Sequence, residues 1–308
     1  MTLEQLRIFV AVAECEHVTR AAEGLRLTQS AVSAAIAALE SQYGVALFDR
    51  VGRRIELNPE GRLFLNEARA VLGRAATAEL ALSEMSGLKR GVLSVQASQT
   101  IASYWLPPRL VAFRRTYPQI EIKLAVGNTA QTAKAIIDGI AELGFVEGRV
   151  DDSALQQSMV DQDRLAIVVA SGHPWARKKR LAEQDIIEGE WVLREQGSGT
   201  RSEFEAALSA KGISPEMMKV VLELPTNEAV RAAVEADAGV TAISELVVEA
   251  ALRAGTLVAL AFQLPARPFL VVRHRDRYQS KAAQAFLKIV TEFAESRPAR
   301  LAARKREG

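Results

Sequence analysis

A stretch near the start of the chain, Val18–Tyr43, constrains the fold most strongly. It reads VTRAAEGLRLTQSAVSAAIAALESQY, which predicts two short helices joined by a tight turn. Thr28 is suited to cap the second helix, because its hydroxyl can accept an orphan backbone N–H. Within that helix Val32, Ile36 and Leu39 recur at i, i+4 and i+7, which predicts a narrow apolar stripe facing a core.

The other face of the second predicted helix carries short polar side chains near its start: Gln29, Ser30 and Ser33. A helix with one buried face and an exposed polar beginning is what a helix-turn-helix uses to reach base edges in the major groove. The same pattern also fits a helical hairpin in an ordinary core, since helix-turn-helix patterns give false matches. The stretch therefore predicts double-stranded DNA as a partner, with a plain hairpin as the alternative.

A small hairpin should complete this head after a first helix capped by Thr2. Its turn residues predict a wing, and its arginines Arg50, Arg53 and Arg54 are suited to grip phosphates beside a groove, with a solvated turn as the alternative. Residues 1–62 hold seven arginines, no lysine and eight acidic residues. Because the head is near neutral, one copy should bind DNA weakly, and two copies on one DNA would relieve that weakness.

The next element should be a long helix that begins after Asn58, a cap residue followed by proline. Apolar residues recur along it every seven residues, interleaved with a second set: Phe64, Val71, Ala78 and Met85 with Ala68, Ala75 and Leu82. Such a seam favours a dimerising linker helix over 59–88, and packing on its own domain is the alternative.

Composition limits the class of protein. The chain has 308 residues, 49% of them hydrophobic and 25% charged, which predicts a globular protein of two or three domains. The single cysteine, Cys15, excludes an internal disulfide framework, suits a reducing cytoplasm, and is expected to be a small core residue. The N-terminus lacks a signal-peptide pattern and no apolar run is long enough to span a bilayer, so a cytoplasmic location and no membrane partner are predicted.

From Gly91 onward, strand and helix patterns alternate, which predicts open and mostly parallel sheets. Separate short strands are expected at 155–160 and 164–170, and a helix over Ile101–Tyr117. In sheets of this kind ligands bind beyond the carboxyl ends of the strands.

Polar residues follow several predicted strands or open the helices after them: Ser98, Gln99, Thr100, Asn128, Glu147, Gly199, Thr200, Arg201 and Asn227. Helix starts present free N–H groups and the positive end of the helix dipole, so the sites favour an anion, to which Arg201 could add a charge-assisted bond. Each site alone is more often a satisfied helix cap, and convergence on one cleft would favour ligand binding.

Evidence for catalysis is thin. The chain contains no phosphate-loop, H-E-x-x-H or G-x-G-x-x-G motif, and its three histidines lack metal-ligand spacing, so no cofactor, metal site or enzyme activity is predicted. A transferase using the loop GSGTR at 197–201 is a remaining alternative, but its serine has no evident base.

The segments LEQLRIFVAVAE, LTQSAVSAAIAALE and GVALFDRVGRRIELNPEGRLFL resemble the N-terminal signature of LysR-type transcriptional regulators. The resemblance implies a winged helix-turn-helix head, a dimerising linker helix and a two-lobed α/β effector domain like a periplasmic binding protein. It also implies a homotetramer on promoter DNA and a small metabolite bound between the lobes. The implied divisions are 1–58, 59–88, 89–300 and a basic tail at 301–308, with lobe I at about 89–162 and 266–300 and lobe II at about 163–265.

By this resemblance the polar residues of the second helix face bases and the hairpin arginines contact the DNA backbone. Ser98, Thr100, Thr200, Arg201 and Asn227 match positions that line the effector cleft. Alanines replace the long polar side chains of many relatives at Ala34, Ala35, Ala37 and Ala38, so DNA shape should supply more of the specificity.

The segments ASQTIASYWLPPRL, VGN, GFVEG and REQGSGTR resemble a branch that includes regulators of sulfur and inorganic-carbon assimilation. Small oxyanions such as sulfite or sulfate then fit the cleft. The predicted function is a DNA-binding regulator that responds to a small, anionic metabolite, and the alternative is a cytoplasmic solute-binding protein without specific DNA binding.

Overall fold

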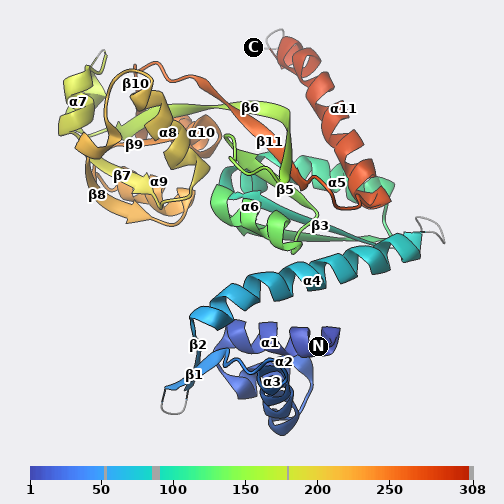
Figure 1. Cartoon of the computed structure of the whole chain (residues 1–308). Coiled ribbons are helices and arrows are strands. Elements are labelled where there is room, and N and C mark those ends of the chain that lie inside the picture. Colours follow the sequence, from blue (N-terminus) through green and yellow to red (C-terminus); the bar gives the residue numbers. More distant parts are fainter. Residues whose placement is uncertain (52–53, 85–90, 179, 305–308) are drawn as a thin grey trace. The chain divides into compact units, whose positions relative to one another are not determined.

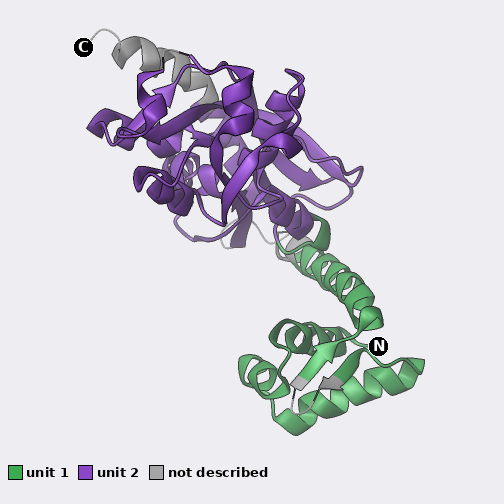
Figure 2. Ribbon diagram, turned by 90° about the vertical axis from the view of Figure 1, so that its left-hand side faces the viewer, with its two compact units in different colours: residues 1–86, 137–140 green, residues 87–136, 141–308 purple. Residues whose placement is uncertain are grey.

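The computed structural model describes residues 1–51, 54–84, 91–178 and 180–304. The chain divides into two compact units, one of residues 1–86 with 137–140 and one of residues 87–136 with 141–308 (Figure 2). Each unit is considered by itself below.

Three helices form the head, α1 (Leu3–Cys15), α2 (Val18–Leu25) and α3 (Gln29–Tyr43). The predicted caps are confirmed, since Thr2 forms a capping box with Gln5 and the Thr28 hydroxyl accepts from the N–H of Ala31 at 3.2 Å. The stripe predicted on α3 is buried in a core with Phe9 and other residues of α1. Cys15 is exposed at the end of α1, so its predicted place in the core is wrong.

The predicted wing is present as a pair of antiparallel strands, β1 (Phe48–Val51) and β2 (Arg54–Leu57), with Phe48 opposite Leu57. The carboxylate of Glu40 on α3 accepts from the backbone N–H of Leu47 at 2.7 Å and from that of Phe48 at 3.3 Å. These bonds attach the base of the wing to the second helix of the motif.

The long helix α4 spans Pro59–Glu84. Its first turns pack on the head, because Ala68 is buried in the head core and the rings of Phe64 and Phe9 lie 4.9 Å apart. The predicted seam is therefore wrong for these two residues, and Met85 lies outside the described residues. Two other members of the predicted seam, Val71 and Leu82, are exposed at 41% and 68%, as is Leu63 at 71%. They fall within an arc of about 100° at 3.6 residues per turn.

The second unit begins with lobe I, in which β3 lies between β4 and β5 and pairs in parallel with both. Helices α5, α6 and α11 accompany this sheet, and Phe113, Phe145 and Phe286 meet in its core. The elements of lobe I are β3 (Gly91–Ser98), η1 (Ile101–Trp105), α5 (Pro107–Thr116), β4 (Ile120–Gly127), α6 (Thr129–Asp138), β5 (Leu143–Glu147) and α11 (Lys281–Arg304). The helix predicted over Ile101–Tyr117 is thus divided, with proline opening its second part.

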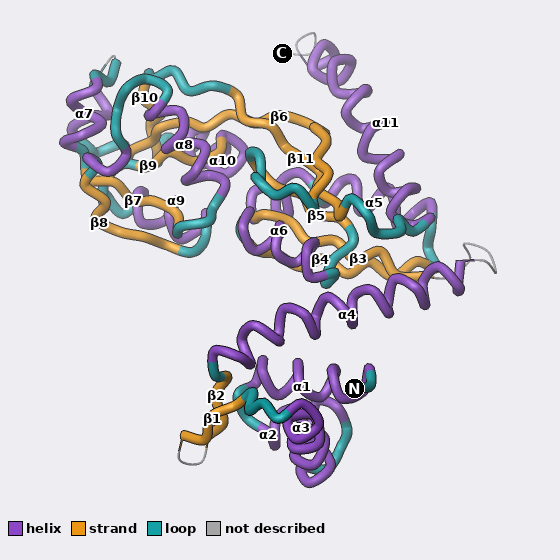
Figure 3. Tube along the Cα trace, in the orientation of Figure 1, coloured by secondary structure: helices purple, strands orange, loops and turns teal. Residues whose placement is uncertain are grey.

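Two long strands join the lobes, β6 (Leu155–Ala170) and β11 (Ala266–His274) (Figures 1 and 3). The first part of β6 pairs with β11, and from Leu165 onward β6 pairs with β9 (Thr241–Ser244) and β10 (Leu257–Leu260). These pairs are antiparallel, as is that of β11 with β5. The expected break after residue 160 and the expectation of mostly parallel sheets are therefore both wrong.

Lobe II holds a second sheet of two parallel strands, β7 and β8. Its core is built around the rings of Trp191 and Phe204, whose centroids lie 4.9 Å apart. The remaining elements are η2 (Pro174–Arg177), α7 (Glu183–Glu188), β7 (Glu190–Arg194), α8 (Gly199–Ser209), η3 (Pro215–Met217), β8 (Lys219–Leu224), α9 (Asn227–Glu235) and α10 (Glu245–Ala254). None of the helices, over the residues described, has the length and apolar character needed to cross a bilayer.

Two glycines of the head offer a matched test of its packing. A Cβ at Gly61 would lie 2.0 Å from the carbonyl oxygen of Leu47, whereas a Cβ at Gly24 would meet no atom within 4 Å. We expect Gly61→Ala to destabilise the head by about 1–3 kcal/mol through overpacking. Gly24→Ala should stabilise it by up to about 1 kcal/mol, because alanine is the better helix former.

Hydrogen exchange of the α1 and α3 amides in the full-length chain measures both effects. Exchange in Gly61→Ala as slow as in the unsubstituted chain would contradict the predicted packing.

Candidate functional site

The polar side chains at the start of α3 are exposed. Gln29, Ser30 and Ser33 are all exposed and lie outside the buried stripe, and the Ser30 hydroxyl lies 3.1 Å from that of Thr28. The alanines that follow on this face, at 34, 37 and 38, are exposed as well. The helix therefore presents a smooth surface with a few short polar groups at one end.

The arginines of the wing cannot be placed in the same way. The backbone of Arg50 belongs to β1 and that of Arg54 to β2, but their side chains and the whole of Arg53 lie outside the described residues. Their predicted contact with the DNA backbone stays a prediction.

The predicted cleft residues lie where the two lobes meet. Gln99, the residue after β3, accepts from the backbone N–H of Asn227 at 2.8 Å. The side-chain amide of Asn227 donates to the Thr100 hydroxyl at 3.1 Å, although 127 positions separate the two residues. Asn227 and Thr100 are both buried. The start of α9 in lobe II is thus bonded directly to the segment that follows β3 in lobe I.

A second contact joins the start of α6 to the loop before α8. The side-chain amide of Asn128 donates to the Glu195 carboxylate at 3.1 Å, and the N–H of Ala130 donates to the carbonyl of Gly197 at 3.2 Å. Asn128 also caps α6 locally by accepting from the N–H of Gln131. Its side chain therefore serves both as a helix cap and as a bridge between lobes.

Gly199 marks a close approach between the lobes. A Cβ there would lie 2.4 Å from the Thr129 hydroxyl and 2.7 Å from the carbonyl oxygen of Glu147. Glu147 is buried at the end of β5, and its carbonyl accepts from the Thr129 hydroxyl at 3.3 Å. Because any larger residue would collide with backbone of the other lobe, glycine is required for this approach.

Thr200 is held by an arginine that the sequence patterns did not single out. The Arg267 guanidinium donates to the Thr200 hydroxyl at 3.0 Å and to the Asp163 carboxylate at 2.7 and 3.0 Å, and all three residues are buried. Arg267 and Asp163 face each other across β11 and β6. No local signal marks the pair, because its members are 104 positions apart.

Arg201 is not placed with this group. Its guanidinium donates to Glu205 at 2.7 Å, to the carbonyl of Arg194 at 3.0 Å and to Glu223, all in lobe II. The guanidinium is thus engaged within its own lobe, and its predicted bond to a ligand stays a prediction. Arg194, which the sequence patterns also missed, donates to Glu195 and to the buried side chain of Asn227.

The electrostatics of the lobe boundary are dominated by carboxylates. Burial raises the pKa of the Glu203 carboxyl on α8, an effect that Arg267 opposes and the charge of Glu147 reinforces. Burial would also raise the pKa of Glu195, but hydrogen bonds from Arg194 and Asn128 hold that pKa below its ordinary value. Since the arginines here are ion-paired, the groups left for a ligand are helix N–H groups and hydroxyls.

One such hydroxyl belongs to Ser98, the last residue of β3. It is 2% exposed and has no hydrogen-bond partner among the described residues. Among all the residues that the structure describes, no group of three His, Cys, Asp or Glu side chains could hold a metal ion.

Two family models match the chain, one over the head and the other over most of the second unit. Residues 3–62 match the bacterial regulatory helix-turn-helix protein of the lysR family, and residues 86–295 match the LysR substrate binding domain. An HTH-type transcriptional regulator of Escherichia coli K12, YeiE, is 37% identical over 289 residues, covering 93% of this chain and 96% of the relative. A probable RuBisCO transcriptional regulator of Trichormus variabilis is 31% identical over 299 residues, covering 95% and 89%.

Solved structures share the fold. CbnR, a LysR family transcriptional regulator, aligns with a TM-score of 0.69 at 22% identity, covering 96% of this chain and 99% of the other. The regulatory domain of Synechocystis CcmR in complex with 2-PG aligns with a TM-score of 0.61 at 24% identity, covering 67% and 98%.

The matched family consists of transcriptional regulators rather than enzymes, so the transferase alternative is excluded. The resemblance noted in the signature segments is confirmed over nearly the whole chain. With a head of the lysR helix-turn-helix type followed by a LysR substrate binding domain, the chain belongs to the LysR family of DNA-binding transcriptional regulators.

Proposed function

We propose that this regulator changes its binding to promoter DNA when a small anionic metabolite binds between lobes I and II. The observation that carries the proposal is the meeting of helix starts from both lobes, those of α6, α8 and α9, beside the end of β3. The helix dipole adds partial positive charge at each start. The first N–H groups of α8 have no partner within their helix, whereas those of Asn227 and Ala130 are already bonded across the boundary. Several such starts at one boundary favour an anion.

The proposed effector is a small anion. Arg194 and Arg267 are ion-paired, and the carboxylates of buried Glu147 and half-buried Glu203 lie nearby. Recognition therefore falls to backbone N–H groups and to hydroxyls such as that of Ser98. Sulfite and sulfate fit this description, and the CcmR regulatory domain, similar in fold, is known with 2-PG. These three compounds are the probes we propose.

We also propose assembly through α4 into a homodimer and further into a homotetramer, acting on promoter DNA in the cytoplasm. Leu63, Val71 and Leu82 leave an apolar face on α4 that a second copy would cover. Apolar side chains are also exposed on two edge strands of the second unit: Leu124 and Val126 on β4 with Val220, Val221 and Leu222 on β8. Edge strands of this kind favour further association.

The effector proposal is tested by a pair of glycines. In Gly199→Ala the new Cβ would collide with the Glu147 backbone, so the lobes cannot keep this approach. We expect the full-length variant to lose the rise in melting temperature caused by sulfite, sulfate or 2-PG, because a ligand stabilises the state that it binds. Gly172→Ala, also in lobe II, places its Cβ in open space and should respond normally.

An unchanged ligand response in Gly199→Ala would exclude this lobe boundary as the effector site. No response by the unsubstituted chain to any of the three anions would exclude the anionic class.

The DNA proposal predicts different effects for two serines of α3. Ser33→Arg should change the preferred DNA sequence, because Ser33 lies on the exposed face near the helix start. Ser41→Arg adds the same charge near the other end of α3 and should leave the sequence preference unchanged. Selection of bound sequences from a random DNA pool compares the three proteins. Identical preferences for Ser33→Arg and the unsubstituted chain would remove Ser33 from the base-reading surface.

The assembly proposal predicts that Leu63→Glu with Val71→Glu dissociates the chain into monomers, since charges would replace the apolar face of α4. Glu79→Ala, an exposed change on the same helix, should leave the assembly intact. Sedimentation velocity measures the mass of each protein. An unchanged mass for the double variant would show that α4 does not hold the copies together.

A further inference from the structure

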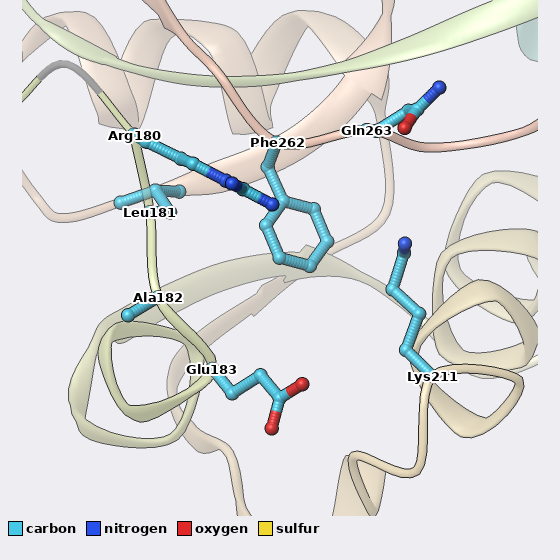
Figure 4. Close-up of a pocket in the computed structure, with 7 residues that line it drawn as sticks. All are labelled: Arg180, Leu181, Ala182, Glu183, Lys211, Phe262 and Gln263. Carbon is cyan, nitrogen blue, oxygen red and sulfur yellow. The ribbon is translucent and has the colours of Figure 1, made fainter.

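A cavity on lobe II lies apart from the boundary between the lobes. It has a volume of about 600 Å³ and is lined by Arg180, Leu181, Ala182, Glu183, Lys211, Phe262 and Gln263 (Figure 4). Ligand sites in proteins span roughly 300–1,000 Å³, so the cavity is large enough for a small metabolite.

The walls of this cavity are anchored in the core of lobe II. Leu181 is buried in that core, and its N–H donates to the carbonyl of Ala261 at 3.3 Å, which ties one wall to the segment that carries Phe262. The turn that carries Lys211 is held by the N–H of Ile213, which donates to the carbonyl of Leu208 at 3.1 Å. A cavity that is already formed costs little ordering when it binds a ligand.

Two cations share the cavity with an aromatic ring. The Lys211 ammonium lies 5.5 Å from the centroid of the Phe262 ring, and Figure 4 shows the Arg180 side chain pointing toward the same ring. Neither cation has an ion-pair partner within the described part of the chain, whereas the nearby Lys178 is paired with Asp185. Lys178 is therefore held in a structural ion pair, whereas Arg180 lines the cavity.

The remaining polar groups indicate what else a ligand would carry. The Glu183 carboxylate, which also lacks an ion-pair partner among the described residues, can accept a hydrogen bond, and the Gln263 amide can donate or accept one. The lining has two positive charges and one negative charge, so it favours an anion that also has an N–H or O–H donor.

We propose that this cavity is a second ligand site, distinct from the lobe boundary, for an anion that carries a planar aromatic ring. The ring would lie against Phe262, the anionic group would lie between Arg180 and Lys211, and a donor on the ring would meet Glu183. Stacking on the Phe262 ring and charge-assisted bonds to two cations supply the affinity. The site does not depend on the identity of the effector bound between the lobes.

The proposal is tested with two aromatic anions that carry amino donors, AMP for a phosphate and 4-aminobenzoate for a carboxylate. Saturation-transfer NMR on the full-length chain at constant ionic strength should show saturable binding of at least one. The matched compounds that lack the charge (adenosine, 4-aminobenzamide) or the ring (phosphate, acetate) should bind about tenfold or more weakly. The anion that binds identifies the phosphate or the carboxylate as the source of the charge.

Variants place that binding in the cavity. Arg180→Gln and Lys211→Gln should each weaken it about tenfold, because each removes one charge-assisted bond. Arg177→Gln removes an exposed arginine of the same basic run outside the cavity lining and should bind as the unsubstituted chain does. Failure of both anions to bind saturably, or binding that neither cavity variant weakens, would overturn the proposal.

Discussion

The buried ion pair between Asp163 and Arg267 is the interaction on which the geometry of the second unit depends. It lies where β6 leaves lobe I and β11 returns to it, so it fixes the pairing of the two strands as they pass between the lobes. Removing one partner of such a pair leaves an uncompensated buried charge, which costs about 3–5 kcal/mol. Arg267 also donates to the Thr200 hydroxyl, so the same guanidinium holds the start of α8 against the paired strands. The proposed effector site is thus built on the connection between the lobes.

This connection explains why the lobe boundary is rich in charge and still suited to a small anion. Each arginine beside it is occupied by a carboxylate, as Arg194 is by Glu195 and Arg267 is by Asp163. Glu147 and Glu203 add two further carboxyl groups. Burial and the charge of Glu147 together raise the pKa of Glu203. Helix dipoles and N–H groups remain to attract an anion, and their electrostatic attraction falls off within one turn of the helix end. A small anion placed against the helix starts benefits from them, and a part of a larger ligand that extends beyond the first turn does not.

The head likewise has little net charge. Its α3 surface presents alanines and three short polar side chains, so few direct bonds to bases are available, and the head as a whole is near neutral. Affinity then depends on where the charges lie and on the number of heads that one DNA engages. The exposed apolar face of α4 supports the proposed pairing of heads, because exposed apolar patches of this kind mark interaction surfaces.

The local order of residues determined the helix-turn-helix, since Thr28 caps α3 and its apolar stripe is buried as the spacing of Val32 and Ile36 predicts. It also determined which helix starts carry polar groups, because caps depend on neighbours within four residues. Only the tertiary structure decided which of those groups meet. Thr100 and Asn227 bond to each other although they are 127 positions apart. Arg201 pairs with carboxylates of its own lobe. Phe64 and Ala68 pack in the head core and not in a free seam. The physical reason is that pairing across a fold depends on the path of strands such as β6, which periodicity and capping patterns do not encode.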